Sequence, residues 1–353
     1  MVKRLRLPLV AVTAAVVLVA CADILGIQDL GNLKAGVDAA PPAEAGPDGD
    51  PRCTADPGPP RPDGGDGTSQ ADLLLAIDSV DFGKVPDVPG LNLDHVCTTD
   101  RASGSCVSSS TVFSAAIDRD GGSDNGAYEV FTTGAGGLSV ATQVKAELKN
   151  GNWSLLLRVR EYDGAADDPS VVVQVATGFG RSGANWSVDA VSVDGGLDGA
   201  LTSTSAWVAG GVLMARFDDF PMVSRSVLGN FIVDMKAAVI TGTLDPTNRT
   251  LTAGTVAGRW PVKSALPEIS RLKATNPPFP VDLCIGTQVA GILCSSRDIL
   301  GKPSDDGTPN ECDAVSMAFA FTASTATFTD PPLDGGGLSP KVCAGAFNST
   351  NCP

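Results

Sequence analysis

The clearest pattern along the chain is the alternation of apolar and polar residues that is typical of half-buried strands. Between residues 153 and 160 the odd positions are apolar, whereas Arg158 and Arg160 carry charge. An Asp- and Gly-rich segment at 163–169 interrupts this run, and a second apolar run begins at 171–175. The two runs and the turn between them predict a β-hairpin.

Two further hairpins are predicted downstream. One pairs residues 231–244 with 250–260 around a polar turn at 245–249, and the other turns at Gly210-Gly211 between 206–208 and 212–217. Helical spacing is confined to 140–148, 262–272 and 287–300. Since paired strands outnumber strand–helix alternations, we predict a mainly β protein whose body is an antiparallel β-sandwich-like structure with a few short helices.

Composition supports a turn-rich fold and narrows the range of functions. The chain holds 40 Gly and 25 Pro, and its formal net charge is −15, from 25 Lys and Arg against 40 Asp and Glu. Short Asp side chains and Gly favour turns over helix interiors. The acidic balance excludes binding of nucleic acid through a basic face.

The first residues predict a signal peptide at 1–20. Lys3, Arg4 and Arg6 precede an apolar run at 7–20, which at about 14 residues is shorter than the roughly 20 that span a bilayer. The sequence Leu18-Val19-Ala20-Cys21 resembles the lipobox of bacterial lipoproteins, and the resemblance implies that Cys21 carries a lipid such as palmitate. The alternative is an ordinary secretory signal that contains a cysteine.

The resemblance also bears on location, which we expect to be the cell envelope, lipid-anchored and outside the cytoplasm. In enteric-type lipoproteins an Asp directly after the lipidated cysteine favours the inner membrane. Ala22 occupies that position here, which favours the outer membrane.

Domain boundaries follow from a change in composition. Residues 38–70 contain eight Pro and six Gly, so we predict that the lipidated N-terminus and a flexible Pro/Gly/Asp linker occupy 21–70. A β-rich globular body then occupies 71–353, with 262–285 as a candidate boundary between two subdomains.

Apart from Cys21, the cysteines are even in number and are expected to form up to four disulfides outside the cytoplasm. No CxxC occurs, and His95 is the only histidine, which argues against a zinc site. We expect local loops between Cys97 and Cys106 and between Cys343 and Cys352, and a partner such as Cys312 for one of Cys284 and Cys294. The candidates are Cys53, Cys97, Cys106, Cys284, Cys294, Cys312, Cys343 and Cys352.

The segment 118–125 is the best candidate for a metal site. Its alternating Asp and Gly resemble the Asp-rich calcium loops of thrombospondin-type repeats, and calcium binds six to eight oxygens. It departs from an EF-hand, since Gly122 and Ser123 replace expected residues and 128–131 reads as a strand. The alternative is a polar turn. The candidate Ca²⁺ ligands are Asp118, Asp120, Asp124, Asn125 and Glu129.

Catalytic motifs are missing, so no catalytic residue is assigned. There is no HExxH, GxSxG or Walker-type loop.

Core packing is expected for Trp153, Trp186 and Trp207, whereas Trp260 is the candidate surface tryptophan. We therefore expect a membrane-anchored lipoprotein that presents a β-rich binding or structural module to a glycan or envelope protein, with calcium as a candidate stabilising ion. The alternative is a secreted polysaccharide hydrolase or lyase that uses Asp and Glu carboxylates.

The body also resembles uncharacterised lipoproteins of myxobacterial type. The likeness rests on the residues at 21–27, the Asp-rich patch after the first cysteine pair, and the segment at 343–352 between the last two cysteines. It implies no activity.

Overall fold

The computed structural model describes residues 53, 57–64, 72–84, 87–99, 104–108, 117–118, 122–132, 140–226, 229–274, 283–284, 286–341 and 352. The predicted signal peptide, Cys21 and Ala22 lie outside these residues. The strands are β1 (Leu73–Asp81), β2 (Ser154–Arg160), β3 (Val172–Ser182), β4 (Asn185–Val188), β5 (Leu201–Thr202), β6 (Ser205–Ala209), β7 (Val212–Ser226), β8 (Gly229–Asp245), β9 (Thr250–Pro261), β10 (Lys273–Ala274), β11 (Leu283–Cys284), β12 (Ala314–Thr325) and β13 (Thr327–Phe328). The helices are α2 (Ala127–Thr132), α3 (Val140–Asn150), α4 (Val262–Ile269) and α5 (Gly286–Ser295), with short 3₁₀ turns at Ala190–Ser192, Leu197–Gly199 and Pro303–Asp305.

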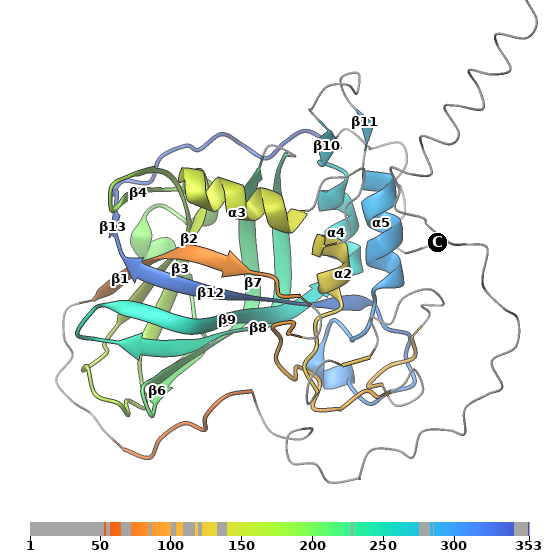
Figure 1. Ribbon diagram of the computed structural model, residues 1–353, viewed down its shortest axis with the longest axis horizontal. Helices are drawn as coiled ribbons and strands as arrows, with labels where there is room; N and C mark the ends of the chain where they lie inside the picture. The colour runs from red at the N-terminus through yellow and green to blue at the C-terminus, as the bar shows by residue number, and fades with distance from the viewer. Residues whose placement is uncertain are drawn as a thin grey trace, which may run out of the picture.

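Eleven strands form one sheet in the order β13-β4-β3-β2-β1-β12-β9-β8-β7-β6, and β5 pairs with β3. All pairs are antiparallel except β13 with β4. The mainly β fold is thus confirmed, and its layers come from one strongly bent sheet rather than two separate sheets (Figure 1). Beyond β6, Asp168 and Val208 exchange two backbone hydrogen bonds of 2.8 Å, which cover the outer edge of that strand.

The three predicted hairpins are present as β2–β3, β6–β7 and β8–β9. Two central strands were not predicted. The strands β1 and β12 pair with each other although they lie at opposite ends of the body sequence, and Figure 1 shows them side by side.

The main core lies on one face of the sheet, under α3 and the group formed by α2, α4 and α5 (Figure 1). It receives Leu155, Leu157 and Val159 from β2, as the alternation predicts. Leu156 points to the opposite face but is also buried, because Trp186 and neighbouring residues fold over it. Buried side chains of α4 and α5 belong to the same core as the strands.

Two local predictions were wrong. Residues 128–131 belong to the helix α2 rather than to a strand, since Ala127, Val130 and Phe131 face the core at helical spacing. Trp260 is only 2% exposed, because β9 is covered on both sides by neighbouring strands and its side chain enters the main core. The buried core positions of Trp153, Trp186 and Trp207 are confirmed.

Among the described residues, disulfides join Cys53 to Cys97, Cys106 to Cys312, and Cys294 to Cys352. The predicted Cys97–Cys106 and Cys343–Cys352 loops were wrong, as was a bond from Cys312 to Cys284 or Cys294. The bonds instead link segments that lie 44 to 206 residues apart in the chain. Cys343 and the side chain of Cys284 lie outside the described residues.

Part of the predicted linker packs on the body. We call residues 58–61 the proline strap. The indole N–H of Trp207 donates a hydrogen bond of 3.1 Å to the carbonyl of Pro59, and Arg61 Nε donates one of 2.6 Å to the carbonyl of Pro169. Gly58 has φ +80° and lies so close to Met214 that an added Cβ would be 2.3 Å from its sulfur. The strap is therefore not a free coil.

Candidate functional site

Two of the predicted calcium ligands meet in a group of four carboxyl groups. Asp118 and Asp124 interact with Asp94, which lies on the preceding loop, and with Asp298, which precedes β12. We call these four residues the carboxylate cluster. Asp120 and the side chain of Glu129 lie outside the described residues, so the structure does not place them.

Loop backbone holds three of these side chains in place. Thr98 N–H donates a hydrogen bond of 2.6 Å to the Asp118 carboxyl group, and Leu93 N–H donates one of 2.6 Å to the Asp124 carboxyl group. Val96 N–H donates a hydrogen bond of 3.0 Å to Oδ1 of Asp94. The disulfide between Cys53 and Cys97 closes on the same loop, directly beside Thr98. The cluster is thus built from loops rather than from strands.

Asp298 joins the cluster to the main sheet. Its carboxyl group accepts hydrogen bonds from the backbone N–H of Ser316, 2.7 Å away, and from the Ser316 hydroxyl. It also accepts one of 3.1 Å from Gly126 N–H. Asn125 links the same loop to β12 through its amide, which donates to the carbonyls of Pro89 and Ala318 at 2.7 and 3.1 Å. Asn125 therefore serves here as a cross-link between backbone segments.

Burial raises the pKa values of all four carboxyl groups, and repulsion from nearby carboxylates adds to it. Burial is the largest cause for each, and it raises the pKa of both Asp118 and Asp298 to about 7. The pKa of Asp124 lies well above its ordinary value, with repulsion from Asp94, Asp118 and Asp298 adding to burial. A hydrogen bond joins Asp118 to Asp124. Two carboxyl groups can form such a bond only when one holds a proton.

Asp94 is the most incompletely bonded member of the cluster. It is 4% exposed, and its Oδ2 makes no hydrogen bond of good geometry, although the Ser105 hydroxyl lies near enough to lower its pKa. Burial nevertheless raises the pKa of Asp94 overall.

A cation beside Asp94, the Arg259 guanidinium, already pairs with another carboxylate. Arg259 is fully buried, and its two terminal nitrogens contact both carboxylate oxygens of Asp306 at 2.7 and 2.5 Å. The same nitrogens donate to the carbonyls of Leu300 and Leu93. Sequence reasoning missed Arg259, Asp298 and Asp306. A charged residue inside the apolar run of β9 was the available signal for Arg259.

The calcium prediction remains a prediction. In the part of the chain that the structure describes, no group of three or more His, Cys, Asp or Glu side chains is arranged to hold a metal ion. The pKa values of the described members of the cluster are raised, so these groups hold their protons to a higher pH than separate aspartates would.

Two open grooves of similar size carry both charge signs. One, of about 460 Å³, is lined by Gly195, Gly196 and acidic residues around Arg158, which pairs with Asp72 at 2.7 Å and Asp198 at 3.0 Å. The other, of about 500 Å³, lies beside β7 and β8, where Lys236 pairs with Asp219 at 2.6 Å. Asp194, Asp198 and Asp330 are exposed side chains of the first groove.

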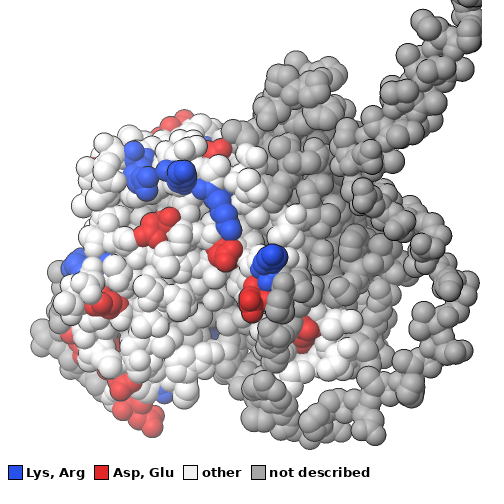
Figure 2. All heavy atoms as spheres, viewed as in Figure 1, with Lys and Arg blue, Asp and Glu red and all other residues white. Residues whose placement is uncertain are grey.

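The described part of the face in Figure 2 likewise shows acidic and basic side chains interspersed. Among the described residues, no helix is both long and apolar enough to cross a bilayer. No protein-family model, curated protein or solved structure matches this chain.

Proposed function

We propose that the protein is a lipid-anchored module of the cell envelope, located outside the cytoplasm, that binds or supports another envelope component. The observation that carries this proposal is the set of disulfides between described cysteines, which join residues 44, 206 and 58 positions apart. Disulfides between such distant segments persist in oxidising compartments and are rare in the cytosol. The N-terminal signal pattern and its lipobox-like end supply the route to such a compartment.

The anchor would connect to the body through a shorter tether than composition alone indicates. The bond from Cys53 to Cys97 joins Cys53 to the body, so the flexible linker that composition predicts would extend only from Cys21 to Cys53. For these 32 residues a flexible coil has a typical end-to-end distance of about 30 Å. The body would therefore lie close to, but not on, the membrane surface. Ala22 favours the outer membrane as that surface.

A binding or structural role is favoured over hydrolysis of polysaccharide by the environment of the carboxylates. A glycosidase needs two carboxyl groups on opposite sides of a substrate in an accessible cleft. In the carboxylate cluster Asp94 and Asp124 are buried and Asp118 and Asp298 are half-buried among loops. The first groove described above has exposed carboxylates on loops and an arginine paired with two acidic residues. A glycan or an envelope protein is the proposed partner.

Membrane fractionation of cells that produce the Cys21→Ser variant tests the anchor. We expect the wild-type protein in the membrane fraction and the variant in the soluble extracytoplasmic fraction. Cys53→Ser is the matched control, since it also removes one cysteine but leaves the lipobox intact, and it should stay with the membrane. A Cys21→Ser variant that remains with the membrane would overturn the proposed anchor.

A further inference from the structure

The proline strap lies on the face of the sheet opposite the main core. Successive side chains of a strand point to opposite faces, and along β6 the main core receives Ala206 and Val208. Trp207, between them, belongs to a separate apolar cluster on the other face, together with Ala209, Met214 and Val239. The strap therefore covers a second, smaller apolar surface of the sheet.

The sequence of the strap and of the residue after it favours a polyproline II conformation. Pro59-Pro60-Arg61-Pro62 has proline at three of four positions, and proline fixes φ at about −65°. Pro59 and Arg61 each precede a proline, which favours an extended backbone. A polyproline II helix has three residues per turn, so residues three apart lie on the same side. Pro59 and Pro62 are half-buried whereas Pro60 and Arg61 are exposed, in agreement with this spacing.

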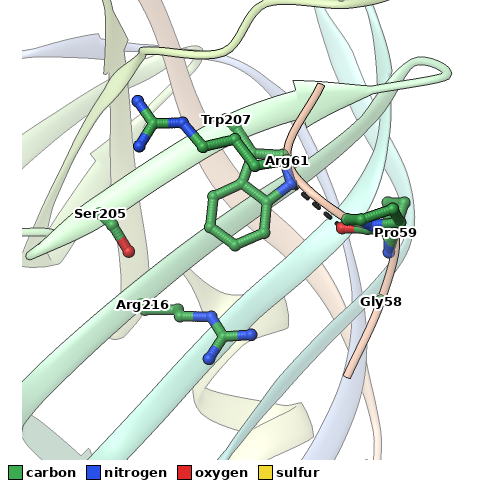
Figure 3. A pocket seen from close by; sticks show the side chains of 7 residues that line it. Gly58, Pro59, Arg61, Ser205, Trp207 and Arg216 are labelled. Atoms are coloured by element: carbon green, nitrogen blue, oxygen red, sulfur yellow. Dashed lines mark hydrogen bonds between the residues drawn. The ribbon is translucent and has the colours of Figure 1, made fainter. Parts of the chain in front are cut away.

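The contact between Trp207 and the strap has the chemistry by which proteins recognise proline-rich peptides. Proline has no backbone N–H, so such a peptide offers mainly carbonyl groups for hydrogen bonding. The Trp207 indole N–H donates a hydrogen bond of 3.1 Å to the carbonyl of Pro59, which Figure 3 draws as a dashed line. Grooves that bind PxxP segments are likewise lined by aromatic side chains, and they exploit a peptide that is already extended.

The surface under the strap is built by the sheet. Trp207 and Met214 are paired across the β6–β7 ladder, and Val239 lies on the next strand, β8. These positions are fixed by the pairing of the strands, so the surface does not need the strap for its shape.

A groove between the strap and the hairpin β6–β7 extends this surface. Its volume is about 540 Å³, within the range of roughly 300–1,000 Å³ that is usual for ligand sites. Its described lining combines strap residues with Ser205, Trp207 and Arg216 (Figure 3). The guanidinium carbon of Arg216 lies 5.6 Å from the centre of the Trp207 ring and helps to orient it. The site is thus larger than the segment that covers it.

We propose that the Trp207 surface is a docking site for an extended proline-rich peptide of an envelope protein, and that the strap occupies it as an internal ligand. The disulfide between Cys53 and Cys97 holds the chain to the body a few residues before the strap. A segment tethered over so short a distance has an effective concentration of the order of millimolar. A partner peptide must therefore displace the strap. The inference rests on the proposed binding role and deepens it by naming the class of partner.

The test measures binding of a fluorescent peptide with the sequence of residues 57–64, Pro-Gly-Pro-Pro-Arg-Pro-Asp-Gly, to the full-length protein in a neutral detergent. The variant Pro59→Gly/Pro62→Gly weakens the strap, because glycine loses more conformational freedom than proline on docking. By fluorescence anisotropy we expect at least about tenfold tighter binding to this variant than to the wild-type protein. A control peptide with alanine in place of every proline should bind at least about tenfold more weakly.

Trp207→Phe, added to the strap-weakened variant, removes the indole donor but keeps an aromatic ring, and should weaken binding by about fivefold or more. Trp186→Phe is the matched control, since it makes the same change at a buried tryptophan of another cluster and should change affinity less than about twofold.

Three results would overturn the proposal. They are no binding to the strap-weakened variant, equal binding of the proline and alanine peptides, and equal weakening by Trp207→Phe and Trp186→Phe. Equal affinity for the wild-type protein and the strap-weakened variant would overturn the role of the strap as an internal ligand. The assay does not depend on cellular location, so its failure would leave the anchor and a glycan partner unaffected.

Discussion

Replacing Asp118 by asparagine tests the protonated state of the carboxylate cluster directly. The side chain of Asp118 accepts a hydrogen bond from Thr98 N–H and shares one with Asp124. An asparagine of the same shape can accept the first bond through its oxygen and donate the second through its amide. Asp118→Asn therefore keeps the geometry while it removes the need for a proton.

The expected magnitude follows from the change in pKa on folding. Burial raises the pKa of Asp118 from about 3.8 to about 7, so the folded state binds a proton over a pH range in which the unfolded state has lost it. Stability therefore falls as pH rises from about 4 to about 7. At 1.36 kcal/mol per pK unit, the wild-type carboxyl group costs folding about 4 kcal/mol at pH 7 and under about 1 kcal/mol at pH 4. We expect Asp118→Asn to stabilise the oxidised protein by about 2–4 kcal/mol at pH 7.

Urea unfolding at a series of pH values, with EGTA present to remove calcium, measures this effect. The gain in free energy of unfolding should be largest near pH 7–8 and should nearly vanish near pH 4. Asp218→Asn is the control, since Asp218 is an exposed residue of β7 outside the cluster. If Asp118→Asn destabilises the protein at neutral pH, or shifts its stability equally at all pH values, the carboxyl group is not held protonated and the reasoning is wrong.

Two other predictions concern the cross-links and calcium. Replacing both Cys106 and Cys312 by serine removes a disulfide that closes a loop of 206 residues, and chain entropy assigns this bond a stabilisation of about 5 kcal/mol. The Cys53–Cys97 disulfide closes a loop of 44 residues, for which the same relation gives a stabilisation of about 4 kcal/mol. Thermal unfolding should therefore show a lower Tm for the Cys106→Ser/Cys312→Ser variant than for the Cys53→Ser/Cys97→Ser variant. The opposite order would contradict the entropic argument. If the predicted calcium ligands do bind the ion, excess Ca²⁺ should raise the Tm above its value in EGTA by several degrees, and Asp118→Asn should reduce that increase. An unchanged Tm in the wild-type protein would exclude calcium stabilisation.

The hairpins could be predicted because their signals are local. In β2–β3 and β8–β9, alternating apolar residues flank a polar turn, and the paired strands adjoin in sequence. The strands β1 and β12 carry no comparable signal, since neither has a turn that leads to its partner. Residues 128–131 were ambiguous for another reason, because a short apolar run fits both a strand and one turn of helix.

The carboxylate cluster and the disulfide pairing depend on contacts that sequence spacing does not encode. Asp94 and Asp298 are separated by about 200 residues and meet only because β12 and the loops after β1 are neighbours. Cys106 and Cys312 meet for the same topological reason, as the adjacent bridge between Val107 and Glu311 shows. Sequence reasoning could recognise Asp118 and Asp124 as unusual, but not identify the residues that surround them.

The chain contains far more Asp than Glu, and this excess has a structural explanation in the fold. In seven places among the described residues, an aspartate accepts a hydrogen bond from the backbone N–H two residues further on. This contact favours turns, and a short side chain can make it with its own backbone. These pairs are Asp81–Gly83, Asp94–Val96, Asp163–Ala165, Asp168–Ser170, Asp189–Val191, Asp245–Thr247 and Asp334–Gly336. A protein whose long strands reverse direction repeatedly needs many such turns. The acidic composition therefore does not by itself indicate carboxylate catalysis.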